Sequence, residues 1–162
     1  MTFEIRDNSI YFCRAGETGR LSACGDNSIR FQASASVKLV EQNWTLMPRK
    51  AAARAWLEEN GNTKEAFIEV GNLRARLEEC GRVTYFRDGE EILREQPELT
   101  FNTGYRHYKS KESNLWSIRV TFEAREDENF YGLGHERMNV FSKKGCTVDL
   151  RHLNAKASIP HV

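Results

Sequence analysis

Apolar and polar residues alternate along most of the chain, as they do in β-strands that bury one face. The clearest case is residues 73–79, where Leu73, Ala75 and Leu77 alternate with charged residues. Similar runs, rich in β-branched and aromatic residues, cover residues 9–15, 20–24, 28–34, 65–70, 82–93 and 115–124. The pattern predicts a chain built mainly from strands.

The predicted strands are separated by residues that favour tight turns. Gly25-Asp26-Asn27, Gly71-Asn72 and Asp88-Gly89 each stand between two alternating runs, and these residue types tolerate the positive φ angles of hairpin turns. Strands at this spacing, without long helices between them, predict an all-β fold, an antiparallel β-sandwich rather than a parallel α/β sheet. We see no internal repeat or domain boundary, so residues 1–162 are expected to form one domain.

In the last alternating run, Trp116, Ile118, Val120 and Phe122 occupy one face. Alternate residues of a strand point to the same side of its sheet. We therefore expect Trp116 to be a core residue.

One segment conflicts with the strand pattern. Residues 48–61 begin with Pro48, contain three consecutive alanines and end at Gly61, a composition typical of a helix. Two interpretations remain open, a short helix near residues 49–59 or an irregular connection.

Composition narrows the class of function. The chain has 24 basic and 23 acidic residues and a net charge of +1, which gives no electrostatic reason to bind nucleic acid or an anionic membrane. No segment approaches the roughly 18 apolar residues of a membrane helix. The start, MTFEIRDNSIYF, carries charges where a secretion signal is apolar. We expect a cytoplasmic protein.

The cysteines Cys13, Cys24, Cys80 and Cys146 show no C-x-x-C spacing, so a zinc site is not indicated. We expect reduced and mostly buried thiols. The sequence indicates neither a metal nor a cofactor.

Gly132-Leu133-Gly134 invites a nucleotide-binding interpretation, which the spacing contradicts. The third position after Gly134 is Arg137 instead of glycine, and Gly145 is followed by Cys146 instead of lysine. The dinucleotide and P-loop patterns therefore both fail. We expect close backbone packing at the first two glycines, where a Cβ would not fit.

Three polar arrangements invite catalytic interpretations. His135 and Glu136 are neighbours, and neighbours in a strand point to opposite faces. His107 with Glu136 would suit the acid/base chemistry of a sugar epimerase if the fold brought the two together. The acidic run at residues 126–128 lacks surroundings that would separate the pKa values of two carboxylates, as glycoside hydrolysis requires.

An ordered set of motifs resembles the N-terminal domain of glycoside hydrolase family 31, which includes α-glucosidases and α-xylosidases. The residues that carry the resemblance are, in order, Trp44-Thr45-Leu46, Gly71-Asn72-Leu73-Arg74-Ala75, Gly81–Phe86, Gly89–Leu93, Phe130–Gly134, Lys144-Gly145, Thr147–Leu150, Asn154 and Ser158-Ile159-Pro160. They are similar to the family's NG-x-L-x-A, YGLG and KG-x-T-V-E-L…N…IP patterns. The resemblance covers nearly the whole chain.

The resemblance implies a fold and a function. In the family this domain is a β-sandwich of the galactose-mutarotase-like type. It precedes a (β/α)8 barrel, which carries the two catalytic aspartates of a retaining mechanism. The barrel's W-x-D-M-N-E motif does not occur here. We therefore expect a non-catalytic N-terminal domain of a retaining α-glycosidase, inactive alone, whose partner is the catalytic barrel.

The sequence departs from the family pattern at two places. His135 stands where the family usually has Glu or Gln, and the chain ends at Val162, where the family's sandwich continues. We expect a sandwich that is incomplete at its C-terminal end and stops before the barrel. Unpaired sheet edges would then favour self-association.

In family members a loop of this domain reaches the sugar site, and the resemblance places His152 and Asn154 on that loop. These two residues are our candidates for binding an α-linked oligosaccharide, because the amide of Asn154 offers both a donor and an acceptor to a sugar hydroxyl. A competing interpretation makes Asn154 a turn residue that caps its own backbone.

Two alternative functions stay open. A free-standing carbohydrate-binding module would need an exposed aromatic platform, for which the candidates are Trp44, Trp56, Trp116 and Tyr105. An aldose-epimerase-like enzyme would use His107 as its base.

Overall fold

The computed structural model describes residues 1–42, 47, 51–97, 104–135, 140–154 and 156–162. These residues form two compact units, Met1–Glu123 and Ala124–Val162. Their regular structure is antiparallel β-sheet apart from one 3-10 turn, η1 (Glu112–Asn114), which confirms the predicted all-β class. Within these residues no helix has the length and apolar character needed to cross a membrane.

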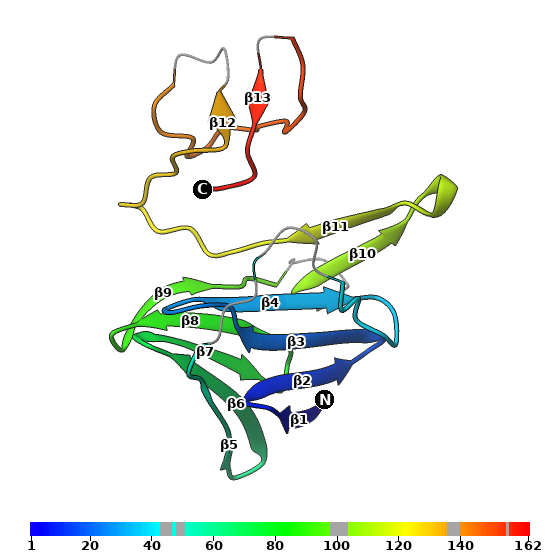
Figure 1. Ribbon diagram of the computed structural model, residues 1–162, viewed down its shortest axis with the longest axis vertical. Helices are drawn as coiled ribbons and strands as arrows, with labels where there is room; N and C mark the ends of the chain where they lie inside the picture. The colour runs from blue at the N-terminus through cyan, green and yellow to red at the C-terminus, as the bar shows by residue number, and fades with distance from the viewer. Residues whose placement is uncertain (43–46, 48–50, 98–103, 136–139, 155) are drawn as a thin grey trace. The chain divides into compact units, whose positions relative to one another are not determined.

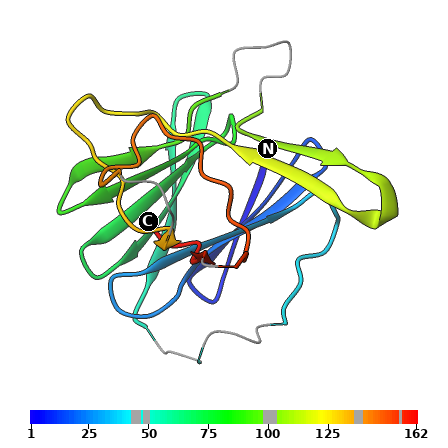
Figure 2. The same ribbon diagram turned by 90° about the horizontal axis from the view of Figure 1, so that it is seen from above.

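The first unit contains two sheets that lie face to face (Figures 1 and 2). In both sheets each strand pairs with the next along the chain. The four-stranded sheet consists of β1 (Thr2–Arg6), β2 (Ser9–Arg14), β3 (Glu17–Ala23) and β4 (Ile29–Ser34). The five-stranded sheet consists of β5 (Arg54–Asn60), β6 (Thr63–Val70), β7 (Leu73–Glu78), β8 (Val83–Arg87) and β9 (Glu90–Arg94).

The core lies between the inner faces of these two sheets. The buried residues of the cluster are Ile10, Phe12, Leu21, Ala66, Ile68, Val70, Ala75, Leu77 and Val83. They follow the alternation of the sequence, since their outward neighbours are mostly charged or polar, with Phe67 on β6 as an apolar exception that packs against Trp56. Burying each of the valine, leucine, isoleucine and phenylalanine side chains of this cluster stabilises the fold by about 1.5–3 kcal/mol relative to leaving it exposed.

The predicted hairpin turns are confirmed, and two of them also join the sheets. Asn27 has a φ of 51°, in the turn between β3 and β4, and its Oδ1 accepts a hydrogen bond from the amide of Asn72 at 2.8 Å. Gly71 stands beside this contact, and a Cβ there would lie 1.8 Å from Asn27 Oδ1. Glycine is therefore required at position 71 for the two turns to approach.

The helix expected near residues 49–59 is wrong over the described residues, and an irregular connection holds only for residues 51–53, which have no regular structure. Residues 54–60 are β5, while residues 48–50 lie outside the described residues. Pairing with β6 gives this segment a full antiparallel partner, and Trp56 stacks on Phe67 with ring centroids 5.2 Å apart. These tertiary contacts override the helix propensity of the sequence.

A hairpin extends the layer of the five-stranded sheet. It consists of β10 (Arg106–Ser110) and β11 (Trp116–Val120), joined through η1. The chain after β11 pairs with the chain after β9 through an antiparallel bridge between Glu95 and Phe122. The amide of Gln96 also donates to the carbonyl of Thr121 at 2.9 Å.

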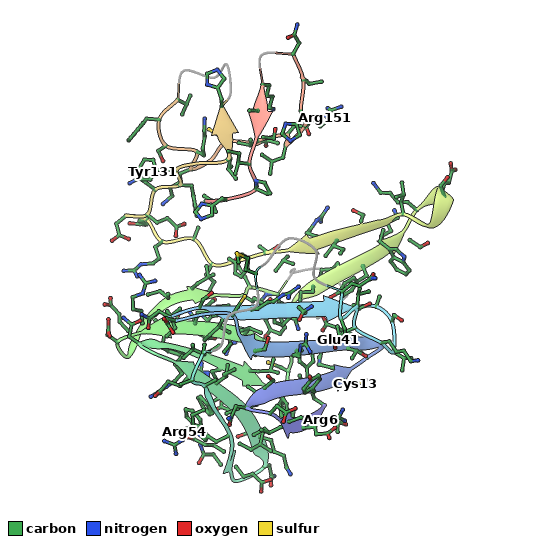
Figure 3. All side chains as sticks on the ribbon, in the orientation of Figure 1. Arg6, Cys13, Glu41, Arg54, Tyr131 and Arg151 are labelled. Carbon is green, nitrogen blue, oxygen red and sulfur yellow. The ribbon has the colours of Figure 1, made fainter. Side chains whose placement is uncertain are left out.

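The expectation that Trp116 is a core residue is wrong. Its side chain is 55% exposed, because β11 lies beyond β4, where the opposing sheet ends in the described part of the chain. The prediction that the thiols are mostly buried is also wrong. Cys13 and Cys80 are exposed, and Cys24 and Cys146 are partly exposed. Cys13 follows Phe12 on β2 and so points away from the core (Figure 3).

The second unit has little regular structure. Its two short strands, β12 (Gly134–His135) and β13 (Ala157–Ser158), pair antiparallel.

We predict that Gly19→Ala destabilises the first unit. Gly19 faces Phe12 across β2 and β3, and an added Cβ would lie 2.1 Å from the Phe12 ring. Displacing a core ring costs about 1–3 kcal/mol of unfolding free energy, measurable by urea denaturation. In the Phe12→Leu background the same substitution should cost less, and strict additivity of the two changes would contradict this explanation.

Candidate functional site

The hairpin is fixed to the sandwich by the buried guanidinium of Arg106, whose side chain is 2% exposed. Its Nε and Nη2 donate to the two carboxylate oxygens of Glu17 at 2.6 and 3.0 Å. Its Nη1 donates to Glu95 Oε2 at 2.5 Å, and its Nη2 also donates to the carbonyl of Gly81 at 2.8 Å. The guanidinium also lies 4.8 Å from the centroid of the Phe31 ring. One side chain therefore joins β10 to both sheets.

The two carboxylates are themselves held by other partners. Glu95 Oε2 accepts a hydrogen bond from the amide of Val83 at 2.9 Å, and Glu17 Oε1 accepts one from the hydroxyl of Tyr108 at 2.7 Å. Buried ions require such additional hydrogen bonds to offset their desolvation. We call Arg106, Glu17, Glu95 and Tyr108 the Arg106 network.

Burial sets the protonation behaviour of this network. Desolvation raises the pKa of Glu95 above its ordinary value, although the charge of Arg106 opposes the shift. Burial alone would lower the pKa of Arg106, but the hydrogen bonds to Glu17 and the charge of Glu95 outweigh it and raise that pKa. Desolvation and the hydrogen bond to Glu17 raise the pKa of Tyr108, so the phenol stays protonated.

Beside the network lies an open cleft of about 510 Å³. It brings together three residues that the sequence analysis considered separately, Tyr105, His107 and Trp116. Desolvation, with a smaller contribution from the Cys80 thiol, raises the pKa of Tyr105 to about 12, so its hydroxyl is protonated at neutral pH. The remaining lining residues are Arg14, Ala15, Gly16, Glu17, Ala35, Gly104, Arg106 and Tyr108.

The acid/base pair considered for an epimerase extends beyond the part of the chain that the structure describes. His107 lines the cleft, while Glu136, the partner considered for it, lies outside the described residues. Glu17 is the one carboxylate among the described lining residues, and Arg106 and Tyr108 together donate to both of its oxygens.

The candidates for an aromatic platform fall in different parts of the fold. Trp56 lies on β5 with its ring stacked on Phe67 and covered by the guanidiniums of Arg54 and Arg74, whose Cζ atoms are 5.1 and 5.7 Å from the ring centroid. Arg54 is labelled in Figure 3. Tyr105 and Trp116 line the cleft together, while Trp44 lies outside the described residues.

The two substrate-binding candidates lie on a turn of the second unit. Leu153 and Lys156 exchange backbone hydrogen bonds of 3.4 and 3.0 Å around this turn. His152 precedes it and Asn154 stands within it, and both are exposed. The ring of His152 accepts a long hydrogen bond, 3.5 Å, from the amide of Ser158. The turn therefore presents both candidates at the surface of this unit, where Arg151 is also found (Figure 3).

The YGLG glycines form the packed base of the same unit. A Cβ on Gly132 would lie 2.5 Å from the carbonyl oxygen of His161, and one on Gly134 would lie 2.1 Å from that of Ala157. Both glycines have positive φ, 99° and 92°. The close backbone packing expected at these positions is confirmed. It places both glycines directly against residues 157–161, the segment that follows the candidate turn.

The Arg106 network was missed by sequence reasoning, because its members stand up to 91 positions apart and resemble surface charges in the sequence. Among the described residues, no group of three metal-ligating side chains comes together.

Comparison with known proteins identifies the family. Residues 18–157 match the glycosyl hydrolase 31 N-terminal galactose mutarotase-like domain. The chain belongs to this family. The match confirms both the resemblance seen in the sequence and the galactose-mutarotase-like β-sandwich.

Two family 31 proteins are similar to this domain. A solved GH31 α-xylosidase from a soil metagenome, complexed with xylose, superposes with a TM-score of 0.86 at 25% identity, covering 99% of this chain and 26% of that one. An uncharacterized family 31 glucosidase, ORF2 of Pseudescherichia vulneris, is 24% identical over an alignment that covers 88% of this chain and 30% of the relative. The chain thus spans less than a third of the length of these relatives.

We predict that Arg106→Met lowers the free energy of unfolding by about 3–5 kcal/mol, because the buried carboxylate of Glu95 and the partly buried one of Glu17 lose their cation. The loss should grow with pH. Without Arg106 the pKa of Glu95 in the folded state rises further above its unfolded value. The folded variant therefore keeps the stability that the protonated Glu95 provides near pH 4.5. It loses that stability as the pH rises past the raised pKa and the buried carboxyl must ionise without a cation. Urea unfolding at pH 4.5 and pH 8 measures both effects.

The matched control for this substitution is Arg74→Met. Arg74 pairs with Glu69 at 2.9 Å, and both side chains are well exposed, so the cost should stay below about 1 kcal/mol. Equal losses for the two variants, or a loss at Arg106 that does not depend on pH, would contradict the assigned role.

We predict that Gly134→Ala opens the base of the second unit, because the new Cβ collides with backbone. Amide exchange at Leu133 and Ile159, which bond His161 and Leu133, should accelerate at least about tenfold. Gly145→Ala is the control, since Gly145 also has positive φ, 74°, but open space around it. Similar exchange in both variants would show that backbone strain alone is responsible.

Proposed function

We propose that this domain packs on the catalytic (β/α)8 barrel of a retaining family 31 α-glycosidase and contributes the turn carrying His152 and Asn154 to the sugar site. The ligand of that site would be an α-linked oligosaccharide. On this proposal the domain itself supplies no catalytic group.

One observation carries the proposal. The chain matches the N-terminal domain of family 31 over residues 18–157, while it aligns with only 26% of a solved α-xylosidase of that family. The groups that cleave the glycosidic bond are then expected in the remaining part of such an enzyme. The cleft beside the Arg106 network agrees with this, because both oxygens of its one described carboxylate, Glu17, already accept hydrogen bonds from Arg106 and Tyr108.

The candidate turn has the properties of a substrate contact. Asn154 and His152 are exposed and stand on a turn closed by backbone hydrogen bonds. An exposed amide supplies a donor and an acceptor at fixed spacing, which suits adjacent sugar hydroxyls. The alternatives have less support, since Trp56 of the candidate platform is covered by two arginines and the one carboxylate that lines the cleft is bonded to Arg106 and Tyr108.

The proposal predicts that the isolated chain does not hydrolyse p-nitrophenyl α-glucoside or α-xyloside above the buffer rate. It also predicts that the chain associates with the remainder of the soil-metagenome α-xylosidase, produced as a separate polypeptide without its aligned 26%. Gel filtration and titration calorimetry measure the association. Enzyme-like turnover by the chain alone, or no association at all, would contradict the proposal.

In the reassembled enzyme, Asn154→Ala should raise the KM for p-nitrophenyl α-xyloside about threefold to tenfold, the worth of one hydrogen bond. Asn60→Ala is the control, because it makes the same chemical change at an exposed end of β5 in the first unit. An unchanged KM for Asn154→Ala would remove that residue from the sugar site.

A further inference from the structure

Ser158 makes two hydrogen bonds to the segment that leads into the candidate turn. We propose that Ser158 positions the ring of His152 so that its Nε2–H donates a hydrogen bond to an oxygen of the bound sugar. The inference rests on the proposed function and deepens it. It makes Ser158 a positioning residue and His152 a neutral donor, a role distinct from that of an acid or a base.

The place of Ser158 on β13 decides where its amide points. Ser158 is 7% exposed and stands opposite Gly134 of β12, the neighbouring strand in Figure 1. The next amide along β13, that of Ile159, donates to the carbonyl of Leu133 at 3.3 Å and so points toward β12. Successive amides of a strand point to opposite edges. The amide of Ser158 therefore points to the edge away from β12.

At that edge both donors of Ser158 meet the candidate turn. Its amide donates to Nδ1 of His152 at 3.5 Å, and its Oγ donates to the carbonyl of Arg151 at 2.9 Å. Arg151 is labelled in Figure 3. One bond thus restrains the backbone just before His152, and the other restrains the ring itself. Because Ser158 is buried, loss of either partner would leave a polar group costly to desolvate.

Other hydrogen bonds close the same turn without help from Ser158. The backbone groups of Leu153 and Lys156 bond each other, and the ammonium group of Lys156 donates to the carbonyl of Asp149. The side chain of Asp149 accepts a hydrogen bond from Nε of Arg151 at 2.6 Å. All of these contacts lie within the second unit. The geometry around His152 therefore follows from that unit by itself.

The contact with Ser158 fixes the tautomer of His152. A neutral imidazole has one N–H donor and one acceptor nitrogen, and the hydrogen bond at one nitrogen decides which of them carries the proton. Nδ1 faces an amide N–H, which can only donate, so Nδ1 is the acceptor and the proton lies on Nε2. His152 is exposed, and within the described residues Nε2 has no hydrogen-bond partner. Its N–H thus stays available to a ligand.

A sugar is a suitable partner for this donor, because each of its oxygens can accept a hydrogen bond. Asn154 stands two positions further along the chain, and its amide adds a second donor and an acceptor. A role of His152 as general base is disfavoured. The one ring lone pair that could take up a proton is that of Nδ1, and the amide of Ser158 already engages it.

The first test measures the contact between Ser158 and His152 in this chain alone. Amide exchange at Ser158, followed by NMR, should accelerate at least about tenfold in His152→Ala, which removes the acceptor. In His152→Asn the exchange should stay slow, because the side-chain oxygen of asparagine can replace Nδ1 as acceptor. Nitrogen-15 NMR of the ring should find the proton on Nε2. A proton on Nδ1, or unchanged exchange in His152→Ala, would overturn the inference.

The second test uses this chain reassembled with the remainder of the soil-metagenome α-xylosidase. His152→Asn keeps the acceptor for Ser158 but loses the Nε2 donor, so the KM for p-nitrophenyl α-xyloside should rise about threefold to tenfold. His152→Gln places an amide N–H close to the position of Nε2, so its KM should rise less. The kcat should stay the same in both variants, because the lost bond is a binding contact. Loss of an acid or base would instead lower kcat by about a hundredfold or more.

Ser158→Ala tests the positioning role directly. It removes the hydrogen bond to the carbonyl of Arg151, so Ser158→Ala should raise the KM about threefold at unchanged kcat. Ser158→Thr keeps a hydroxyl and should restore the KM of the parent chain. The control is His161→Asn, the same chemical change at an exposed position of the second unit, which should leave the KM unchanged.

The outcomes separate this inference from the proposed function. If the polypeptides associate and Asn154→Ala raises the KM, but His152→Asn and His152→Gln behave alike, the inference is overturned and the proposed function stands. A fall in kcat of about a hundredfold in His152→Asn would assign a catalytic role and also overturn the inference. If the polypeptides do not associate, the proposed function fails, and the assignment of His152 to a sugar fails with it.

Discussion

The first unit depends on one buried cation placed between two carboxylates. Arg106 is the group through which β10 meets both sheets, because Glu17 belongs to one sheet and Glu95 continues the other. A buried ion pair of this kind contributes little net free energy compared with apolar residues of the same volume, but removing one partner is costly. Its effect is thus to make one position of the hairpin much more favourable than the alternatives.

That constraint also fixes the side of the hairpin that faces the cleft, which Tyr105, His107 and Trp116 help to line. The hairpin cannot rotate without breaking the contacts of Arg106 and Tyr108 with Glu17. The same contacts hold the walls of the cleft at fixed separation. The domain therefore presents preformed surfaces instead of collapsing them, and preformed surfaces lose less entropy when a partner binds.

Much of the sandwich could be predicted because its determinants are local. Leu73, Ala75 and Leu77 alternate with charges, and glycine and asparagine mark the turns, so strand type and pairing follow from neighbouring residues. Residues 54–60 were mispredicted because their strand form depends on β6, with which Trp56 makes its ring contact. The exposure of Trp116 and the burial of Arg106 depend on where the opposing sheet ends and on partners 89 positions away, which periodicity does not encode. For the candidate turn, the family resemblance supplied the residues, and composition alone would not have found them.

The strand order has a consequence for how this domain forms during synthesis. Each sheet is a meander whose strands pair with their immediate neighbours, so each can assemble from local contacts soon after it leaves the ribosome. The apolar face of the four-stranded sheet then stays uncovered until about sixty further residues have emerged and the five-stranded sheet is complete. The hydrogen bond from Asn72 to Asn27 is a polar contact, formed early along the chain, that can register one meander on the other. Arg106 emerges later. The growing polypeptide can thus align its two sheets through Asn27 and Asn72 before Arg106 joins them by its contacts with Glu17 and Glu95.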